Sequence, residues 1–414
     1  MSRRLPLVGV LVGVALVLSY IVVWAGVSPV RERGSDFSVA LVAGQLVRDG
    51  HGAQLYDQAF EHARHASLLP GGVTFNLPYI SPPVTALLAL PATLLDPGAA
   101  YRVWSLLQLG ALGVALWMVY RVAPWPASVG RRARLAVVAL AAASPATLVL
   151  LLMGQWDGLI ALGLAVAYVS WRHDRPGTAG FALALALSLT KPHLGLGLAA
   201  FLLARRDGRA IAGAAAGVAI AVGLSLGTSG LAGLGGFAGA LDGALTNTPP
   251  QSTLGLSGLV SSWIGSGPAT AALVGVGSIA ALVGAAVLGL RSRRPGGLEL
   301  ALGGAVALSL LIAPHLLAHD LVLLAPPMVW VAAWALGFAA ARDGAARAPA
   351  TTWPLFVIVL LGALVAADAG NSASAPPGRV VPLGLVACGA AAVIALRPRR
   401  RVTVASATPA RSPA

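Results

Sequence analysis

Long apolar segments separated by short polar breaks occupy most of the chain. Many of them approach the length of about 20 residues that a helix needs to cross a bilayer. Backbone N–H and C=O groups in lipid must be satisfied within the segment itself, which favours helices over open sheet. The pattern predicts an all-α, polytopic membrane protein with about 10–13 transmembrane helices. The candidate spans are residues 5–27, 80–95, 100–120, 135–153, 157–171, 177–190, 193–204, 210–228, 269–290, 297–313, 320–341, 354–368 and 381–396.

Basic clusters lie between many of these segments, and the positive-inside rule places them in the cytoplasm. Both termini are then cytoplasmic, and the loops 28–79 and 229–268 face outward. We expect residues 1–401 to form one membrane domain and residues 402–414 a disordered cytoplasmic tail. The clusters are residues 131–134, 172–175, 205–209, 291–294, 342–347 and 397–401.

The number of crossings near the start of the chain is ambiguous. Three candidate spans lie between the basic N-terminus and the basic loop 121–134, although two cytoplasmic segments need an even number between them. The segment 80–95 contains Pro82, Pro83 and Pro91, so it is either re-entrant or interfacial. The alternative is that the loop 121–134 faces outward.

Composition supports a membrane location. Hydrophobic residues make up 57% of the 414 residues and charged residues 10%, with a mean hydropathy of +0.82, which a soluble protein could not bury. We interpret the net charge of +14 as basic loops facing the cytoplasm of a cell membrane rather than as nucleic-acid binding. The first apolar segment resembles a signal peptide but lacks a small-residue cleavage site, which favours an uncleaved helix. A single cysteine, Cys388, excludes an intrachain disulfide and a cysteine-based metal site.

Asp36 is the acid that follows the first apolar segment, at the outer membrane boundary. There it can stay ionised and meet a polar acceptor. The sequence Gly34-Ser35-Asp36 before an amphipathic stretch is also typical of a helix N-cap, which would serve a helix over residues 37–49. Both interpretations remain open from the pattern alone.

Lys191 is the only lysine in the chain and lies between two apolar segments. A cation in that position is costly unless it is paired, near the surface or bound to an anion. Pro192 interrupts the helix at this point. We expect a phosphate at the outer headgroup level as the partner of Lys191, with a lysine that snorkels to the interface as the alternative.

Two polar breaks on the outward side carry further candidates. Gln155, Trp156 and Asp157 form a tight break in which Asp157 either caps the following helix or contacts a ligand. Asn247 and Gln251 lie in the long later loop. Their amides could hydrogen-bond sugar hydroxyls, although a plain loop is an equal alternative.

His315, His319 and Asp320 cluster at an outward helix end. A spacing of four residues would put both imidazoles on one helical face, where they could bind a metal. The sequence offers no evident third ligand nearby, so we expect a hydrogen-bonding role and no metal or other cofactor.

Taken together, these features resemble glycosyltransferase family 87, a group of GT-C-fold membrane enzymes that use polyprenyl-phosphate mannose. The resemblance covers about residues 35–330. The chain has Ser81 where an aromatic residue usually precedes the Pro-Pro pair, Asp157 where asparagine is usual, and a late loop without the usual tryptophan. The matching stretches are Ser35-Asp36-Phe37, Tyr56-Asp57, Ser81-Pro82-Pro83, Gly154-Gln155, Thr190-Lys191-Pro192, and Pro314 with His319.

The resemblance implies a reaction and a site. Asp36 would be the general base that takes a proton from an acceptor hydroxyl, while Lys191 and His319 would bind the donor phosphate. The sugar, mannose by this resemblance, would pass with inversion from a polyprenyl-phosphate donor to a glycolipid or polysaccharide acceptor. The remaining substrate contacts would come from Tyr56, Gln155, Asp157, His193, Asn247, Gln251, His315 and Asp320.

Two other functions compete with this one. A transporter or lipid flippase should carry ionisable groups at mid-membrane and broken helices in symmetric halves. Here most acids lie at helix ends or in outward loops. A polytopic assembly protein without chemistry is the third hypothesis. Convergence of Asp36, Lys191 and His319 on one cavity would distinguish it from an enzyme.

Overall fold

The protein is helical throughout the part that the computed structural model describes, which comprises residues 5–68, 77–247, 253–340 and 379–396. No strand occurs in these ranges, so the predicted all-α class is confirmed. The elements are α1 (Leu5–Ala25), α2 (Pro29–Arg33), α3 (Asp36–Arg48), η1 (Gly52–Gln54), α4 (Gln58–Leu68), α5 (Pro83–Ala89), η2 (Leu90–Leu94), α6 (Pro97–Val122), α7 (Arg131–Ala142), α8 (Pro145–Met153), α9 (Asp157–Arg172), α10 (Pro176–Leu189), η3 (Pro192–Gly195), α11 (Leu196–Ala204), α12 (Gly208–Asn247), α13 (Leu256–Ile264), α14 (Pro268–Arg291), α15 (Leu298–Leu311), η5 (Ala318–Leu324), α16 (Ala325–Ala340) and α18 (Val380–Ala395).

Several helices have the length and apolarity of membrane spans, as expected for a polytopic membrane protein. Among the described residues, five helices are long and apolar enough to cross a bilayer, or six if the bent pair α7–α8 is one span. Five more apolar helices are shorter, at 10–17 residues. The predicted span 354–368 lies outside the described residues. The five long helices are Leu5–Ala25, Pro97–Val122, Gly208–Gly243, Pro268–Arg291 and Ala318–Gly337.

Proline shortens or breaks two of the predicted spans. The segment 80–95 contains only the short helices α5 and η2, and Pro83–Leu94 is counted among the helices too short for a span. The segment 135–153 is not one helix, because α7 and α8 meet at a bend of 45°. Pro145 lacks the N–H that would continue the helix, and the Ser144 hydroxyl instead accepts a hydrogen bond from Ala146 N at 3.3 Å.

The segment 229–268, predicted as an outward loop, is largely helical where it is described. Helix α12 continues past the predicted end of its span to Asn247, with a kink at Gly230, whose φ is +65°. Helix α13 follows within the same segment. The segment 28–79, also predicted as a loop, contains α2, α3, η1 and α4.

Glycines allow the helices to cross closely. A Cβ atom on Gly158 of α9 would lie 2.2 Å from the carbonyl oxygen of Gln108 on α6. A Cβ atom on Gly180 of α10 would lie 1.9 Å from the carbonyl oxygen of Ala210 on α12. Small residues at crossings let backbones approach and maximise van der Waals contact, which drives helix association where lipid removes the hydrophobic effect.

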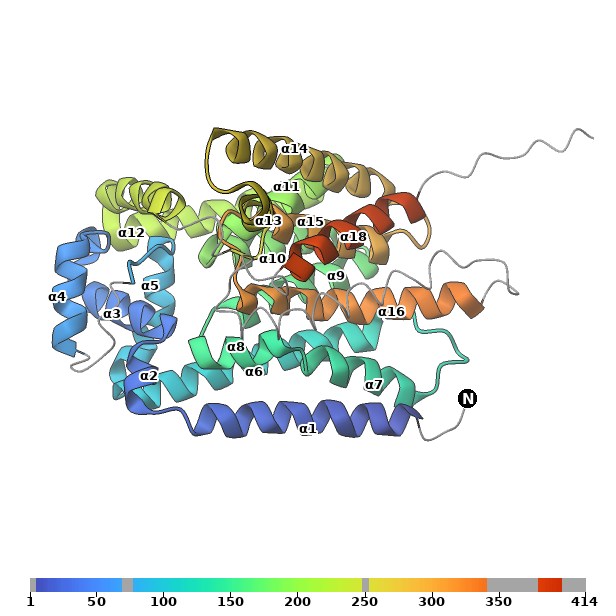
Figure 1. Ribbon diagram of the computed structural model, residues 1–414, viewed down its shortest axis with the longest axis horizontal. Helices are drawn as coiled ribbons and strands as arrows, with labels where there is room; N and C mark the ends of the chain where they lie inside the picture. Colours follow the sequence, from blue (N-terminus) through green and yellow to red (C-terminus); the bar gives the residue numbers. More distant parts are fainter. Residues whose placement is uncertain (1–4, 69–76, 248–252, 341–378, 397–414) are drawn as a thin grey trace, which may run out of the picture.

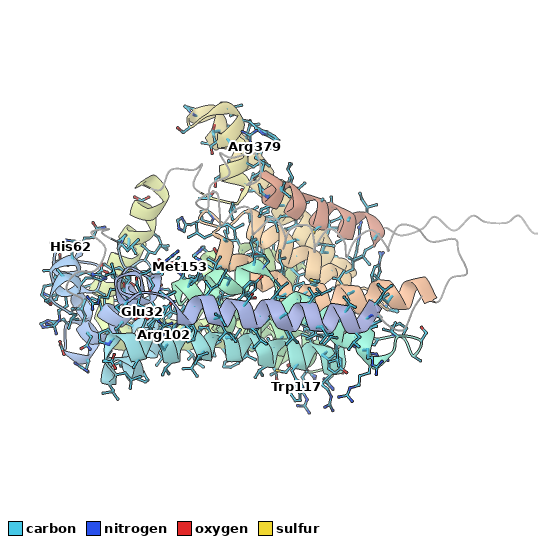
Figure 2. All side chains as sticks on the ribbon, turned by 60° about the horizontal axis from the view of Figure 1, so that its bottom comes forward. Glu32, His62, Arg102, Trp117, Met153 and Arg379 are labelled. Carbon is cyan, nitrogen blue, oxygen red and sulfur yellow. The ribbon has the colours of Figure 1, made fainter. Side chains whose placement is uncertain are left out.

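The helices form an elongated bundle with a cap of short helices at one end (Figure 1). Helix α1 runs along one edge beside α7 and α8, while α2, α3, α4 and α5 gather at the end of the bundle with part of α12. Arg102 of α6 connects the C-terminal end of α1 to α2 of the cap. Its guanidinium donates to Val27 O at 3.0 Å and binds the Glu32 carboxylate. Figure 2 shows Glu32 and Arg102 together at this junction.

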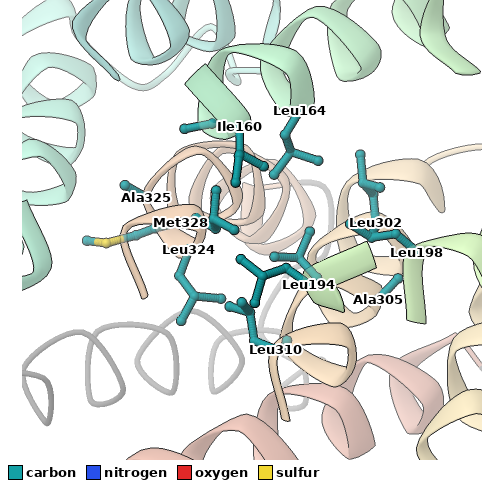
Figure 3. Packing of buried hydrophobic residues seen from close by; sticks show 14 of the residues in the cluster. Ile160, Leu164, Leu194, Leu198, Leu302, Ala305, Leu310, Leu324, Ala325 and Met328 are labelled. Carbon is teal, nitrogen blue, oxygen red and sulfur yellow. The ribbon is translucent and has the colours of Figure 1, made fainter. Parts of the chain in front are cut away.

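The largest apolar core lies in the other half of the bundle. Ile160 and Leu164 of α9 lie there with Leu194 of η3, Leu198 of α11 and Met328 of α16 (Figure 3). All five side chains are at most 5% exposed. Helix α9, which begins at residue 157, η3, which follows residue 191, and η5, which contains residue 320, all pack into this core. The site described next is built from these three residues and their neighbours.

Candidate functional site

A cavity of about 470 Å³ lies where the cap of short helices meets the bundle. Its wall combines the first turn of α3, the loop 77–81, the turn between α8 and α9, the break between α10 and η3, and the segment 315–320. The polar and titratable side chains in that wall are Asp36, Gln58, Tyr79, Ser81, Gln155, Thr190, Lys191, His193, His315, His319 and Asp320.

Asp36 occupies the first position of α3 and faces this cavity. The N-cap of α3 is Ser35, not Asp36, so the capping interpretation of Asp36 is wrong. The Asp36 carboxylate instead accepts a hydrogen bond from Gln155 Nε2, across 119 residues of sequence. The side chain is therefore held at the cavity wall and left with oxygen lone pairs for a ligand.

Aromatic packing fixes the first turn of α3 in this position. Phe37 is 2% exposed and stacks on Trp104 of α6 with ring centroids 5.6 Å apart. The Trp104 indole donates to Gly154 O at 2.9 Å and meets the edge of Trp156 at 4.4 Å. The same tryptophan thus connects α3 to the turn that carries Gln155.

Burial changes the acid–base behaviour of Asp36. The low-dielectric surroundings raise the pKa of Asp36 above its ordinary value, because burial disfavours the charged form. The Gln155 hydrogen bond and the positive charge of Lys191 oppose that shift. A carboxylate with a raised pKa is a stronger base than an exposed one, which suits proton abstraction.

Lys191 is paired in the structure and is not a lone cation. Its Nζ donates to Asp157 Oδ1 and Oδ2 at 3.1 and 3.0 Å and to Asp320 Oδ1 at 2.6 Å. Thr190 and Lys191 leave the helical conformation before Pro192, as the sequence indicates. The residue is 8% exposed and reaches the cavity, so the expectation of a snorkelling lysine at the interface is wrong.

Asp157 lies behind Lys191 rather than in the cavity wall. It is fully buried, and α9 begins at Asp157 with Trp156 at the N-cap and no side-chain capping bond. The capping interpretation of Asp157 is therefore wrong. Its carboxylate holds the ammonium group of Lys191, which is the role that the structure gives it.

The histidines approach the cavity from separate segments. His315 lies in a turn and His319 in the 3₁₀-helix η5, so the prediction that one helical face carries both is wrong. His193, on η3, lies in the same wall. Nδ1 of His315 and Nδ1 of His319 are buried and lack a hydrogen-bond partner among the described residues. Burial lowers the pKa of His315, which favours its neutral imidazole.

A cluster of possible metal ligands lies at the base of the cavity. Ligand atoms of Asp157, His319 and Asp320 all lie within 4.8 Å of one another. The sequence grouped His319 and Asp320 but did not indicate Asp157 as a further ligand, because Asp157 lies more than 160 positions before Asp320. Asp320 is also fixed by its backbone, since its Oδ2 accepts from Leu317 N at 2.7 Å.

Tyr56 supports the wall from outside. Its hydroxyl donates to Ser81 O at 2.6 Å, and its ring packs 5.6 Å from that of Tyr79. Glu61, which is not among the predicted site residues, accepts from Tyr79 N at 3.1 Å and is 3% exposed. Glu61 is the only acid of α4, and no sequence signal separates it from the other acids of the segment 28–79. The Asn247 side chain and all of Gln251 lie outside the described residues.

Asp36, Lys191 and His319 thus reach one cavity from three segments far apart in the chain. A sequence model of glycosyltransferase family 87 matches residues 79–314, more than half of the chain. No curated protein and no solved structure matches it.

Proposed function

The chain belongs to glycosyltransferase family 87, and we propose that it moves a mannose residue from a polyprenyl-phosphate donor to a hydroxyl of a glycolipid or polysaccharide. It is therefore a membrane glycosyltransferase, and the transporter and scaffold hypotheses give way to enzymatic transfer. The observation that carries the finer proposal is the cavity shared by Asp36, Lys191 and the three histidines.

Asp36 acts as the general base in this proposal. As the acceptor oxygen bonds to the anomeric carbon, its proton passes to the Asp36 carboxylate. The bond between the anomeric carbon and the phosphate oxygen breaks at the same time, and its electron pair stays on the phosphate. The leaving group is already a stabilised anion, so the step needs no separate general acid.

The opposite side of the cavity binds the donor phosphate. Neutral imidazoles of His193, His315 and His319 can donate N–H groups to phosphate oxygens, and Lys191 supplies positive charge beside them. The apolar outer faces of the surrounding helices keep the reaction in the membrane, where the polyprenyl tail of the donor lies between helices. We place the cavity on the outer face of the cell membrane.

The environment of the carboxylates supports the proposal of inversion. A retaining enzyme needs a second carboxylate as nucleophile. Asp36 and Asp320 are the described carboxylates in the cavity wall. Both Asp320 oxygens are engaged, one by Lys191 and the other by Leu317 N. Asp36 alone is free to act, which supports a single displacement.

Membranes containing the protein test this proposal. They would be incubated with radiolabelled polyprenyl-phosphate mannose and extracted glycolipid and polysaccharide acceptors. We expect label in an α-linked product that, unlike the glycosyl-phosphate donor, is stable to mild acid. Membranes without the protein are the control. Equal transfer from a nucleotide sugar without the polyprenyl donor would contradict the proposed donor, and a β-linked product would contradict inversion of a β-linked donor.

A further inference from the structure

The side chains at the cavity carry more carboxylates than cations. Two carboxylates, Asp157 and Asp320, bind the ammonium of Lys191, and a third, Asp36, lines the same cavity. Lys191 is the only lysine or arginine among the described residues in the cavity wall. The donor brings a phosphodiester anion, and the departing lipid phosphate carries a second negative charge. A low-dielectric site strengthens the repulsion between this phosphate and the carboxylates, so positive charge in addition to that of Lys191 would stabilise the bound phosphate.

The geometry around Lys191 is that of a cation site. Its ammonium lies 3.0 Å from Asp157 Oδ2 and 2.6 Å from Asp320 Oδ1, between the two carboxylates. Ligand atoms of Asp157, His319 and Asp320 lie within 4.8 Å of one another. Opposite ligands of an ion with bonds of about 2.1 Å are about 4.2 Å apart, so only a small closure would be needed.

His319 gives a second indication of a ligand, because its Nε2 lies 3.5 Å from Asp320 Oδ1 while its other ring nitrogen is unsatisfied within the described part of the chain. It is 2% exposed and lies in the cavity wall, yet its Nδ1 has no hydrogen-bond partner among the described residues. A buried imidazole nitrogen without a partner is costly. Binding of a metal ion by one nitrogen would fix the tautomer of the ring and leave the other nitrogen as an N–H donor to a ligand.

We propose that Asp157, His319 and Asp320 bind a divalent cation of the Mn²⁺ or Mg²⁺ class, which displaces the Lys191 ammonium and carries the donor phosphate as a further ligand. Carboxylate oxygens with one imidazole suit Mn²⁺. Lys191, released from its two acids, then turns its ammonium toward the same phosphate. Without the ion, the Lys191 ammonium takes its place as the counterion of Asp157 and Asp320. This inference rests on the proposed function for its phosphate ligand but not for the ion.

Direct binding of Mn²⁺ tests the site. The full chain, purified in detergent and stripped with EDTA, would be titrated with Mn²⁺ while electron paramagnetic resonance measures the free ion. We expect one bound ion per chain. Asp320→Asn and His319→Gln should weaken binding by about tenfold or more. Asp96→Asn and His62→Gln are matched controls, because Asp96 caps α6 and His62 is exposed on α4; both should bind normally.

Lys191→Met gives the sharpest outcome. It keeps an unbranched side chain that is one atom shorter, and it removes the ammonium that competes with the ion. We expect it to bind Mn²⁺ about tenfold more tightly than the wild type and to gain thermal stability when Mn²⁺ is added. A merely structural lysine predicts a destabilised variant that Mn²⁺ does not rescue. Lys191→Met and His319→Gln carry the test if Asp320→Asn does not fold.

The outcomes separate the metal from the reaction. Absence of Mn²⁺ binding by the wild type at millimolar concentration, or equal binding by His319→Gln, would overturn the site. Full transfer from polyprenyl-phosphate mannose in EDTA would also overturn it and leave the proposed function intact. Specific Mn²⁺ binding without transfer from any polyprenyl-phosphate sugar would instead support the site and reject the proposed donor.

Discussion

Asp36 and Glu61 are both held near the cavity by a single hydrogen-bond donor, but their surroundings give them different roles. Asp36 faces the cavity and accepts from the Gln155 amide. Glu61 lies behind the wall and accepts from the Tyr79 backbone. Burial raises the pKa of each carboxyl group. For Asp36 this strengthens a base, whereas for Glu61 it makes the wall of the site sensitive to pH.

Asp36→Asn should abolish most transfer without harming the fold. Asparagine keeps the size of the side chain and removes the charge and the basicity. Loss of a general base costs on the order of a hundredfold or more, so transfer from the polyprenyl donor should fall by about that factor. Membrane assays with immunoblotting for insertion measure it, and Asp96→Asn serves as the control. Near-normal transfer by inserted Asp36→Asn protein would remove Asp36 from the mechanism.

Glu61→Gln should remove a pH dependence of stability. The pKa of Glu61 is raised by burial to about 7 from an ordinary 4.5. Between these values the folded state binds more protons than the unfolded state, so stability falls as pH rises through this window and is level above about 7. The loss is about 3 kcal/mol. Thermal unfolding in detergent should show the variant more stable than the wild type at pH 8 and equal to it near pH 4.5. If the stabilities of the variant and the wild type changed in parallel between pH 4.5 and 8, Glu61 would not have a raised pKa.

At the scale of helices, residues that break them were predictable and contacts between them were not. Pro192 ends a helix where its missing N–H indicates. Pro145 also interrupts a helix, but the segment 135–153 was predicted as one span. Hydropathy alone does not show that a backbone N–H is missing from an apolar segment. Lys191 was expected to need an anion, and its carboxylate partners lie 34 and 129 residues away. The sequence around Lys191 does not indicate which distant carboxylates it pairs with.

Gly154→Ala should damage the site through the turn between α8 and α9. Gly154 has a φ of +62°, which costs an alanine about 1 kcal/mol. A Cβ atom there would lie 2.7 Å from Phe37 Cβ, so α3 must shift and carry Asp36 away from Gln155. A displacement of about 1 Å can cost on the order of a hundredfold in rate. Transfer and thermal unfolding would be measured together.

The control for this glycine is Gly113→Ala in the middle of α6, where no atom lies within 4 Å of the new Cβ. Alanine should stabilise that helix by about 0.5–1 kcal/mol and leave transfer unchanged. If Gly154→Ala retained full transfer, the position of α3 would not depend on this turn.

At the scale of the whole molecule, apolar length predicted the class of the protein and the family resemblance predicted which segments meet. The sequence could not decide whether 80–95 crosses the membrane, and the structure places only the short helices α5 and η2 there. Two long helices, α1 and α6, then separate the N-terminus from the loop 121–134. That even number favours the interpretation in which both lie in the cytoplasm.

Cysteine labelling in intact cells tests this topology. The native Cys388 is 1% exposed and would be replaced by alanine, so that a single reporter remains. Ala63→Cys, exposed on α4 of the cap, should react with an impermeant maleimide in whole cells. Arg293→Cys, exposed after α14, should react only after the cells are opened, because the positive-inside rule predicts a cytoplasmic location for its cluster of arginines. Labelling of Arg293→Cys in intact cells would invert the topology. The cavity lies beside the cap, so such an inversion would place the reaction on the cytoplasmic face and change which pool of polyprenyl-phosphate donor the enzyme can reach.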